Sequence, residues 1–139
     1  MKKVVALVLG IILLGTVLPQ TGAISVTTTT GLSPTMIMML SYFYYRNYNA
    51  LLSEFNSTYQ KAVELGVDNV TLSKAMELYS NATVLIQKAT QYSAGGNILA
   101  SLGSYRIMIL VRNAYFYLSE AFNVLNEAVQ NKTFTGIHH

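Results

Sequence analysis

Residues 97–130, NILASLGSYRIMILVRNAYFYLSEAFNVLNEAVQ, repeat small or aliphatic residues every seven positions. Two interleaved series run through this stretch at alternating spacings of four and three, the pattern of a helix that buries one edge against its neighbours. One series is mostly alanine and the other mostly branched: Ala100, Ile107, Ala114, Ala121 and Ala128 form the first, and Ser104, Val111, Leu118 and Leu125 the second. We therefore expect a long packed helix whose alanines let partner helices approach closely.

The polar residues of the same stretch avoid this edge. At about 100° per residue, they fall on the opposite side of the helix. They are Arg112, Asn113, Glu120, Asn123 and Glu127. We expect the two carboxylates to be solvated surface groups rather than an acid/base pair.

A first helix is expected from Ser33 or Thr35 to about Leu65. Pro34 suits the first turn of a helix, and Gly66 is a typical C-terminal stop. Its main apolar stripe consists of Ile37, Ser41, Tyr44, Tyr48, Leu51, Phe55, Tyr59 and Ala62.

A second helix is expected from the N-cap Asp68 to about Tyr92. The turn 94–97 follows it, with Asn97 as the expected cap of the third helix. The inner face of the second helix is predicted to comprise Leu72, Ala75, Met76, Tyr79, Ala82, Ile86 and Ala89. Because both connections are short, consecutive helices should be antiparallel. The predicted fold is all-α, an up-down-up three-helix bundle over residues 35–132, with residues 133–139 as a flexible tail.

The segment before the bundle divides into two parts. Residues 1–23 carry Lys2 and Lys3, then the apolar run 4–18, then small residues before a possible cleavage point, as in a secretory signal peptide. An uncleaved anchor is the alternative, although the run is shorter than the roughly 20 residues that span a bilayer. Residues 24–34 are Thr-rich and read as a linker, or as a strand donated to a neighbouring subunit.

Composition excludes several classes of function. Charged residues make up 11% of the chain, less than half the usual share. Beyond residue 23 the basic and acidic residues nearly balance, so no basic stripe exists and we expect no nucleic-acid partner. Cysteine is absent, which excludes disulfides and thiolate chemistry. His138 and His139 end the chain, no metal-binding or nucleophile motif occurs, and we expect no catalytic residue, metal or cofactor.

Apolar residues also occur where a three-helix bundle does not need them. In the first helix Met39, Tyr42 and Phe43 point away from the main stripe, and in the third helix Tyr105, Ile109 and Phe116 do the same. Both sets lie in the N-terminal halves of their helices and hence at the same end of the bundle. A second apolar face on a helix should contact something else. We expect an interface here, with Arg46 and Arg112 beside it.

Four asparagines begin N-x-Thr triplets, the acceptor pattern for N-glycosylation. They are Asn56, Asn69, Asn81 and Asn131. Three of them are expected at or toward the end opposite the apolar residues, and Asn81 near the middle.

These features predict a structural protein rather than an enzyme. We expect a secreted, N-glycosylated subunit of a filament, cell-surface layer or virion coat that associates with copies of itself through its N-terminal end. An archaeal source would suit glycosylation without cysteine. Two alternatives remain: an envelope protein held at membrane lipid by its retained N-terminal segment, or a helical module that binds a small ligand in a cavity lined by Tyr44, Tyr48 and Tyr79.

Overall fold

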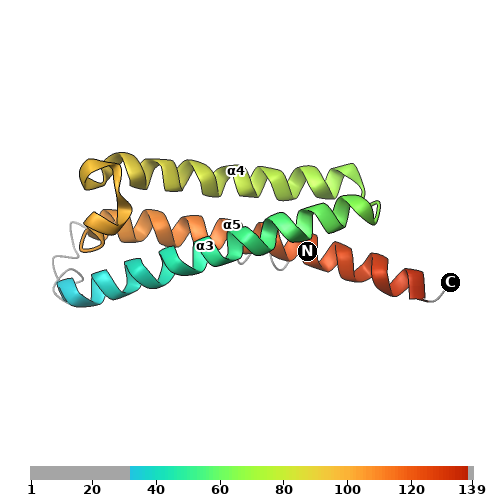
Figure 1. Ribbon diagram of the computed structural model, residues 1–139, viewed down its shortest axis with the longest axis horizontal. Helices are drawn as coiled ribbons and strands as arrows, with labels where there is room; N and C mark the ends of the chain where they lie inside the picture. Colours follow the sequence, from blue (N-terminus) through green and yellow to red (C-terminus); the bar gives the residue numbers. More distant parts are fainter. Residues whose placement is uncertain (1–31, 138–139) are drawn as a thin grey trace, which may run out of the picture.

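The computed structural model describes residues 32–137, which form three long helices packed together (Figure 1). Helix α3 spans Pro34–Glu64, α4 spans Asn69–Tyr92 and α5 spans Tyr105–Ile137. Two short 3-10 turns, η1 (Ala94–Gly96) and η2 (Ile98–Ser101), join α4 to α5. No strand occurs within residues 32–137, so the all-helical prediction is confirmed for this part of the chain. The predicted signal or anchor segment and most of the linker lie outside the described residues.

The first two helices begin and end where the sequence predicts. Ser33 caps α3, its hydroxyl accepting a hydrogen bond from the backbone N–H of Met36 at 3.1 Å. Asp68 caps α4 by accepting from the N–H of Thr71 at 3.2 Å. Between them Gly66 has a φ of 77°, a left-handed conformation that residues with a Cβ rarely adopt. The chain therefore reverses within a few residues, and α4 runs antiparallel to α3.

Helix α5 is the central element. It packs along both α3 and α4, while those two helices barely touch each other. Its predicted edge is buried from Ile107 onward, with Val111, Ala114 and Leu118 fully inaccessible to solvent. The matching faces also repeat every seven residues: Ser41, Tyr48, Phe55 and Ala62 on α3, and Ala75, Ala82 and Ala89 on α4. Alanines on both α4 and α5 allow their backbones to approach closely, as the sequence predicts.

The beginning of the third helix was predicted wrongly. Asn97 caps the 3-10 turn η2 through the N–H of Leu99, and α5 begins eight positions later at Tyr105. Ala100, the first member of the predicted edge, is therefore exposed. Gly95 and Gly96 both adopt positive φ and turn the chain, and the Ser104 hydroxyl then accepts from the N–H of Ile107 at the true start of α5. Ala100 was included in the predicted edge because it lies seven residues before Ile107, but it belongs to the 3-10 turn η2 and not to an α-helix.

The far end of α5 and one residue of α4 also differ from expectation. Helix α5 continues to Ile137 rather than ending near Gln130, and its last turns extend past the turn that joins α3 to α4 (Figure 1). Met76, expected on the inner face of α4, is 39% exposed because the three buried alanines place the centre of that face a quarter turn away. Within the described residues, no helix is both long enough and apolar enough to cross a lipid bilayer.

Candidate functional site

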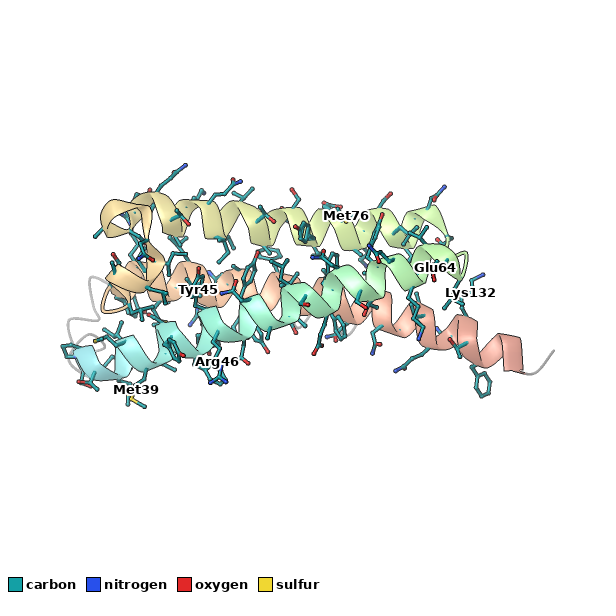
Figure 2. The ribbon with its side chains drawn as sticks, viewed as in Figure 1. Met39, Tyr45, Arg46, Glu64, Met76 and Lys132 are labelled. Atoms are coloured by element: carbon teal, nitrogen blue, oxygen red, sulfur yellow. The ribbon has the colours of Figure 1, made fainter. Side chains whose placement is uncertain are left out.

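The N-terminal half of α3 exposes large apolar side chains. Positions Ile37 and Ser41 face the core, so the residues between and around them point outward. We call these outward residues the methionine face; they are Met36, Met38, Met39, Tyr42 and Phe43, with exposed fractions between 47% and 67%. Figure 2 shows Met39 and Arg46 projecting from the edge of α3 that is turned away from α4 and α5. Three of the residues predicted for the interface, Met39, Tyr42 and Phe43, thus belong to one continuous exposed surface.

The predicted interface residues of α5 are less accessible. Tyr105, Ile109, Arg112 and Phe116 are all half-buried rather than exposed. One cause is contact with α3, because the ring of Phe116 packs against that of Tyr44 at a centroid distance of 5.8 Å. The guanidinium of Arg112 donates to the Oδ1 atom of its neighbour Asn113 at 3.5 Å, and its buried Nε atom has no protein partner.

Tyr44 joins the two predicted surfaces. Its ring meets Phe43 edge-on at 5.4 Å on one side and contacts Phe116 and Tyr115 on the other. Such edge-to-face pairs stabilise contacts beyond the area that they bury. The aromatic series Phe43–Tyr44–Phe116 therefore runs from the methionine face across to α5. Sequence reasoning placed Tyr44 in the core stripe and missed this role, which depends on how α3 is rotated against α5.

The size of the methionine face bears on what it can bind. Five large side chains, each about half exposed, offer on the order of 500 Å² of accessible surface. This is as large as the largest apolar patch of a typical monomer, but smaller than the roughly 800 Å² that each partner contributes to a stable interface of standard size. A stable interface at this end therefore needs the half-buried residues of α5 as well as the methionine face.

The four N-x-Thr asparagines, Asn56, Asn69, Asn81 and Asn131, are all exposed. Asn69 is the first residue of α4, and Asn131 lies in the last turns of α5. The start of α4 and the last turns of α5 lie at the end of the bundle opposite the start of α3, which carries the methionine face (Figure 1). Asn56 and Asn81 lie within α3 and α4, away from the helix ends.

Glu120 does not behave as predicted. The sequence places it on the solvated side of α5, but its side chain is only 3% exposed and its Oε1 atom has no protein partner. Because α5 lies between the other two helices, its flanks are more covered than those of a helix with one neighbour. Burial raises the pKa of the Glu120 carboxyl, while the positive charge of Lys74 on α4 opposes that rise. Glu127 is exposed, as expected.

The described residues contain no group of three or more His, Asp or Glu side chains that could hold a metal ion. The tyrosines predicted to line a ligand cavity pack against other side chains of the bundle. Tyr79 stacks on Phe55 at 5.0 Å, and burial raises the pKa of the Tyr48 hydroxyl, which lies beside Thr83. A groove of about 300 Å³ instead lies at the opposite end from the methionine face, lined by Val67, Asp68, Thr71, Val124, Glu127, Ala128, Asn131 and Lys132.

Comparison with known proteins finds one informative similarity. The chain is similar to part of pyrolysin from Pyrococcus furiosus, with 34% identity over 94 residues, or 68% of this chain. The chain spans only about 7% of the length of that relative. Because only 31 residues precede the described region, most of a 94-residue match falls on the helical part. No family model matches the chain, and no solved structure resembles it significantly.

Proposed function

We propose that this protein is a structural subunit of an extracellular assembly, which associates with copies of itself through the methionine face and the adjoining residues of α5. The observation that carries the proposal is the concentration of exposed Met, Tyr and Phe side chains on one end of α3. Methionine side chains are flexible and polarisable and adapt to irregular partner surfaces. The aromatic series through Tyr44 extends this surface to a second helix, which supplies the additional area that a stable contact requires.

A second copy is the occupant that an uncharged apolar surface favours. Met39, Tyr42 and Phe43 carry no charge, and the cations in the N-terminal halves of the two helices are Arg46, Arg106 and Arg112, of which Arg106 lies over the ring of Tyr92. No acidic residue occurs in α3 before Glu54 or in α5 before Glu120, so the charges beside this surface are all positive, and a contact between two copies must leave these arginines at its solvated rim. An uncharged apolar surface with a polar rim can be complementary to itself, as a two-fold interface requires.

The segment that is similar to pyrolysin corresponds to about 7% of that protein, so the activity of the whole protein is not carried over to this chain. We infer that the helical unit is a module that also occurs as a segment of a longer protein. We further propose that the protein is secreted and that its exposed N-x-Thr asparagines carry glycans, which would keep the opposite end of the bundle from associating.

The test compares two exposed substitutions with two matched controls in the full chain. Met39→Ser with Phe43→Ser removes the centre of the methionine face, and we expect the mass measured by light scattering to fall from oligomer to monomer. Met76→Ser with Phe134→Ser changes the same residue types at other exposed positions and should leave the mass unchanged. Circular dichroism should show equal helicity in both variants, because all four side chains are exposed.

A wild-type protein that stays monomeric up to millimolar concentration would overturn the proposal. If it remained monomeric but bound to neutral lipid vesicles through the same residues, the methionine face would be a membrane-contact surface instead.

A further inference from the structure

We propose that the four acceptor triplets differ in when they can be glycosylated. Asn69 and Asn131 can be modified on the folded protein, whereas Asn56 and Asn81 can be modified only before α3 and α4 pack. This inference rests on the glycosylation proposed above, and it adds which asparagines can be modified before folding and which after it. It follows from where each triplet lies in a helix and from what its middle and third residues contact.

The triplet pattern itself requires an extended chain. A transferase that selects N-x-Thr must contact the asparagine and the residue two positions later in one cleft. In an extended chain the side chains of residues i and i+2 lie on the same side, but in an α-helix they point about 200° apart. A helical triplet therefore has to open locally before it is recognised.

The transfer also needs the asparagine amide to be free to react. A bond forms between the asparagine Nδ2 atom and the anomeric carbon of a sugar, and the bond from that carbon to a phosphate oxygen of a polyprenyl-linked donor breaks. The lipid phosphate departs with the electron pair of the broken bond, and the one proton that the amide loses passes to a basic group of the transferase or to that phosphate. Local opening of the helix also releases the asparagine from its contacts in the folded state, so the cost of opening decides between the four sites.

Opening is most costly at Asn81. The middle residue of its triplet, Ala82, is completely buried in the core. The third residue, Thr83, donates its hydroxyl hydrogen bond to the carbonyl of Tyr79 at 3.0 Å and lies beside the buried Tyr48. Extending this triplet removes Ala82 from its contact with α5, which amounts to unpacking α4.

Asn56 is subject to a similar constraint. It directly follows Phe55, which is 1% exposed and stacks on Tyr79 of α4. Thr58 is itself half-buried. Extending residues 56–58 in the middle of α3 would pull Phe55 out of the core.

The third triplet begins at the first residue of α4, and the fourth lies within the last two turns of α5. Asn69 is the first residue of α4, Val70 is 79% exposed, and the Thr71 hydroxyl donates to the capping carboxylate of Asp68 at 2.8 Å. At the end of α5, residues 131–133 are all exposed, and Thr133 donates to the carbonyl of Val129 at 2.9 Å. Helix ends open at a small fraction of the free energy of global unfolding.

The experiment measures the rate of modification at each site after folding. Full-length chain made without glycans and folded is incubated with a purified oligosaccharyltransferase and its lipid-linked donor, using an enzyme that modifies short peptides of all four triplets. Glycopeptide mass spectrometry over time should show Asn69 and Asn131 modified at least tenfold faster than Asn56 and Asn81. Leu125→Ala, which lowers the stability of the core, should speed modification of Asn81 but leave Asn131 unchanged.

Equal rates at Asn81 and Asn131 on the folded wild-type chain would overturn the inference. Failure of Asn69 and Asn131 to react on the folded chain, while their peptides react, would overturn it as well. The parent proposal is tested separately by the intact mass of protein from its native source: a mass without glycans removes the proposed glycosylation, but the order of rates in vitro stands or fails independently.

Discussion

At the scale of single residues, stability depends on a few side chains along α5 that are shared by both neighbours. Leu118 is fully buried and belongs to the cluster that contains Tyr48 and Phe55 of α3 and Ala82 of α4. Leu118→Ala would leave a cavity between three helices and should cost about 2–5 kcal/mol in the free energy of unfolding. Urea denaturation measures this loss. Val84→Ala, at a position 45% exposed, is the matched control and should change stability by less than about 0.5 kcal/mol.

The stability of the start of α4 depends on pH through the capping carboxylate of Asp68. Hydrogen bonds from the side chain and backbone of Thr71 lower the pKa of its carboxyl below the ordinary value. Because the folded state holds the ionised form, the contribution of the cap is fully present above the unfolded pKa of about 3.9 and is lost as the pH falls through the folded value. Thermal melting between pH 6 and pH 2 should show this loss.

A matched substitution isolates the cap from the other carboxyl groups. Asp68→Asn keeps the capping geometry without a titrating group, so its melting temperature should fall less steeply with acid than that of the wild type. Identical acid profiles for the two proteins would mean that the cap does not contribute to the pH dependence.

At the scale of the helix, α4 is fitted to α5 by small residues. Ala75, Ala82 and Ala89 are completely buried at successive seven-residue intervals. Ala82→Leu adds volume at a completely buried position in the core cluster that α4 shares with α5, and overpacking of this kind costs about 1–3 kcal/mol. Urea unfolding tests it, with Ser80→Leu as a control that adds a leucine at an exposed position of the same helix. A small effect at both positions would show that α4 can shift outward without loss.

The same helices show which helix caps and buried positions can be predicted from the sequence. Caps and seven-residue repeats are local or periodic signals, and they placed Ser33, Asp68 and the edge from Ile107 to Ala128 correctly. Asn97 and Ala100 were misplaced because a cap residue and a spacing do not distinguish a 3-10 turn from an α-helix. The burial of Glu120 and the bridging position of Tyr44 depend on α5 having a neighbour on each side, which no single-helix pattern contains.

The candidate site was accessible to prediction only in part. Met39, Tyr42 and Phe43 could be placed on the outside of α3 because the periodic core stripe fixes the opposite face of that helix. Ile109 and Phe116 could be placed opposite the edge of α5, but their half-burial could not, since it depends on contacts between helices. The aromatic series through Tyr44 is thus a property of the assembled bundle rather than of either helix.

At the scale of the whole molecule, α3 and α4 are held together chiefly through α5. Their direct contacts are few, with the stacking of Phe55 on Tyr79 and the approach of Tyr48 to Thr83 among them. Folding of either outer helix therefore depends on α5 being in place. The two ends of the molecule differ: one carries the methionine face, and at the other α5 extends past the turn that joins α3 to α4 (Figure 1).

This arrangement predicts a gradient of local stability along α5. Residues 107–125 contain the fully buried positions, whereas residues 130–134 are all exposed beyond Val129. An exposed helix end gains less from tertiary packing than a buried segment does, and most helix stability in proteins comes from such packing. Amide hydrogen exchange, followed by NMR or mass spectrometry at concentrations where the protein is monomeric, should be faster for residues 131–137 than for residues 111–125 by on the order of a hundredfold or more. If both segments were equally protected in the monomer, other parts of the chain would have to cover the end of α5. If protection of residues 131–137 appeared only as the concentration rose, this end would take part in self-association, and the contact between copies would run from the end of α5 to the methionine face instead of joining two like faces.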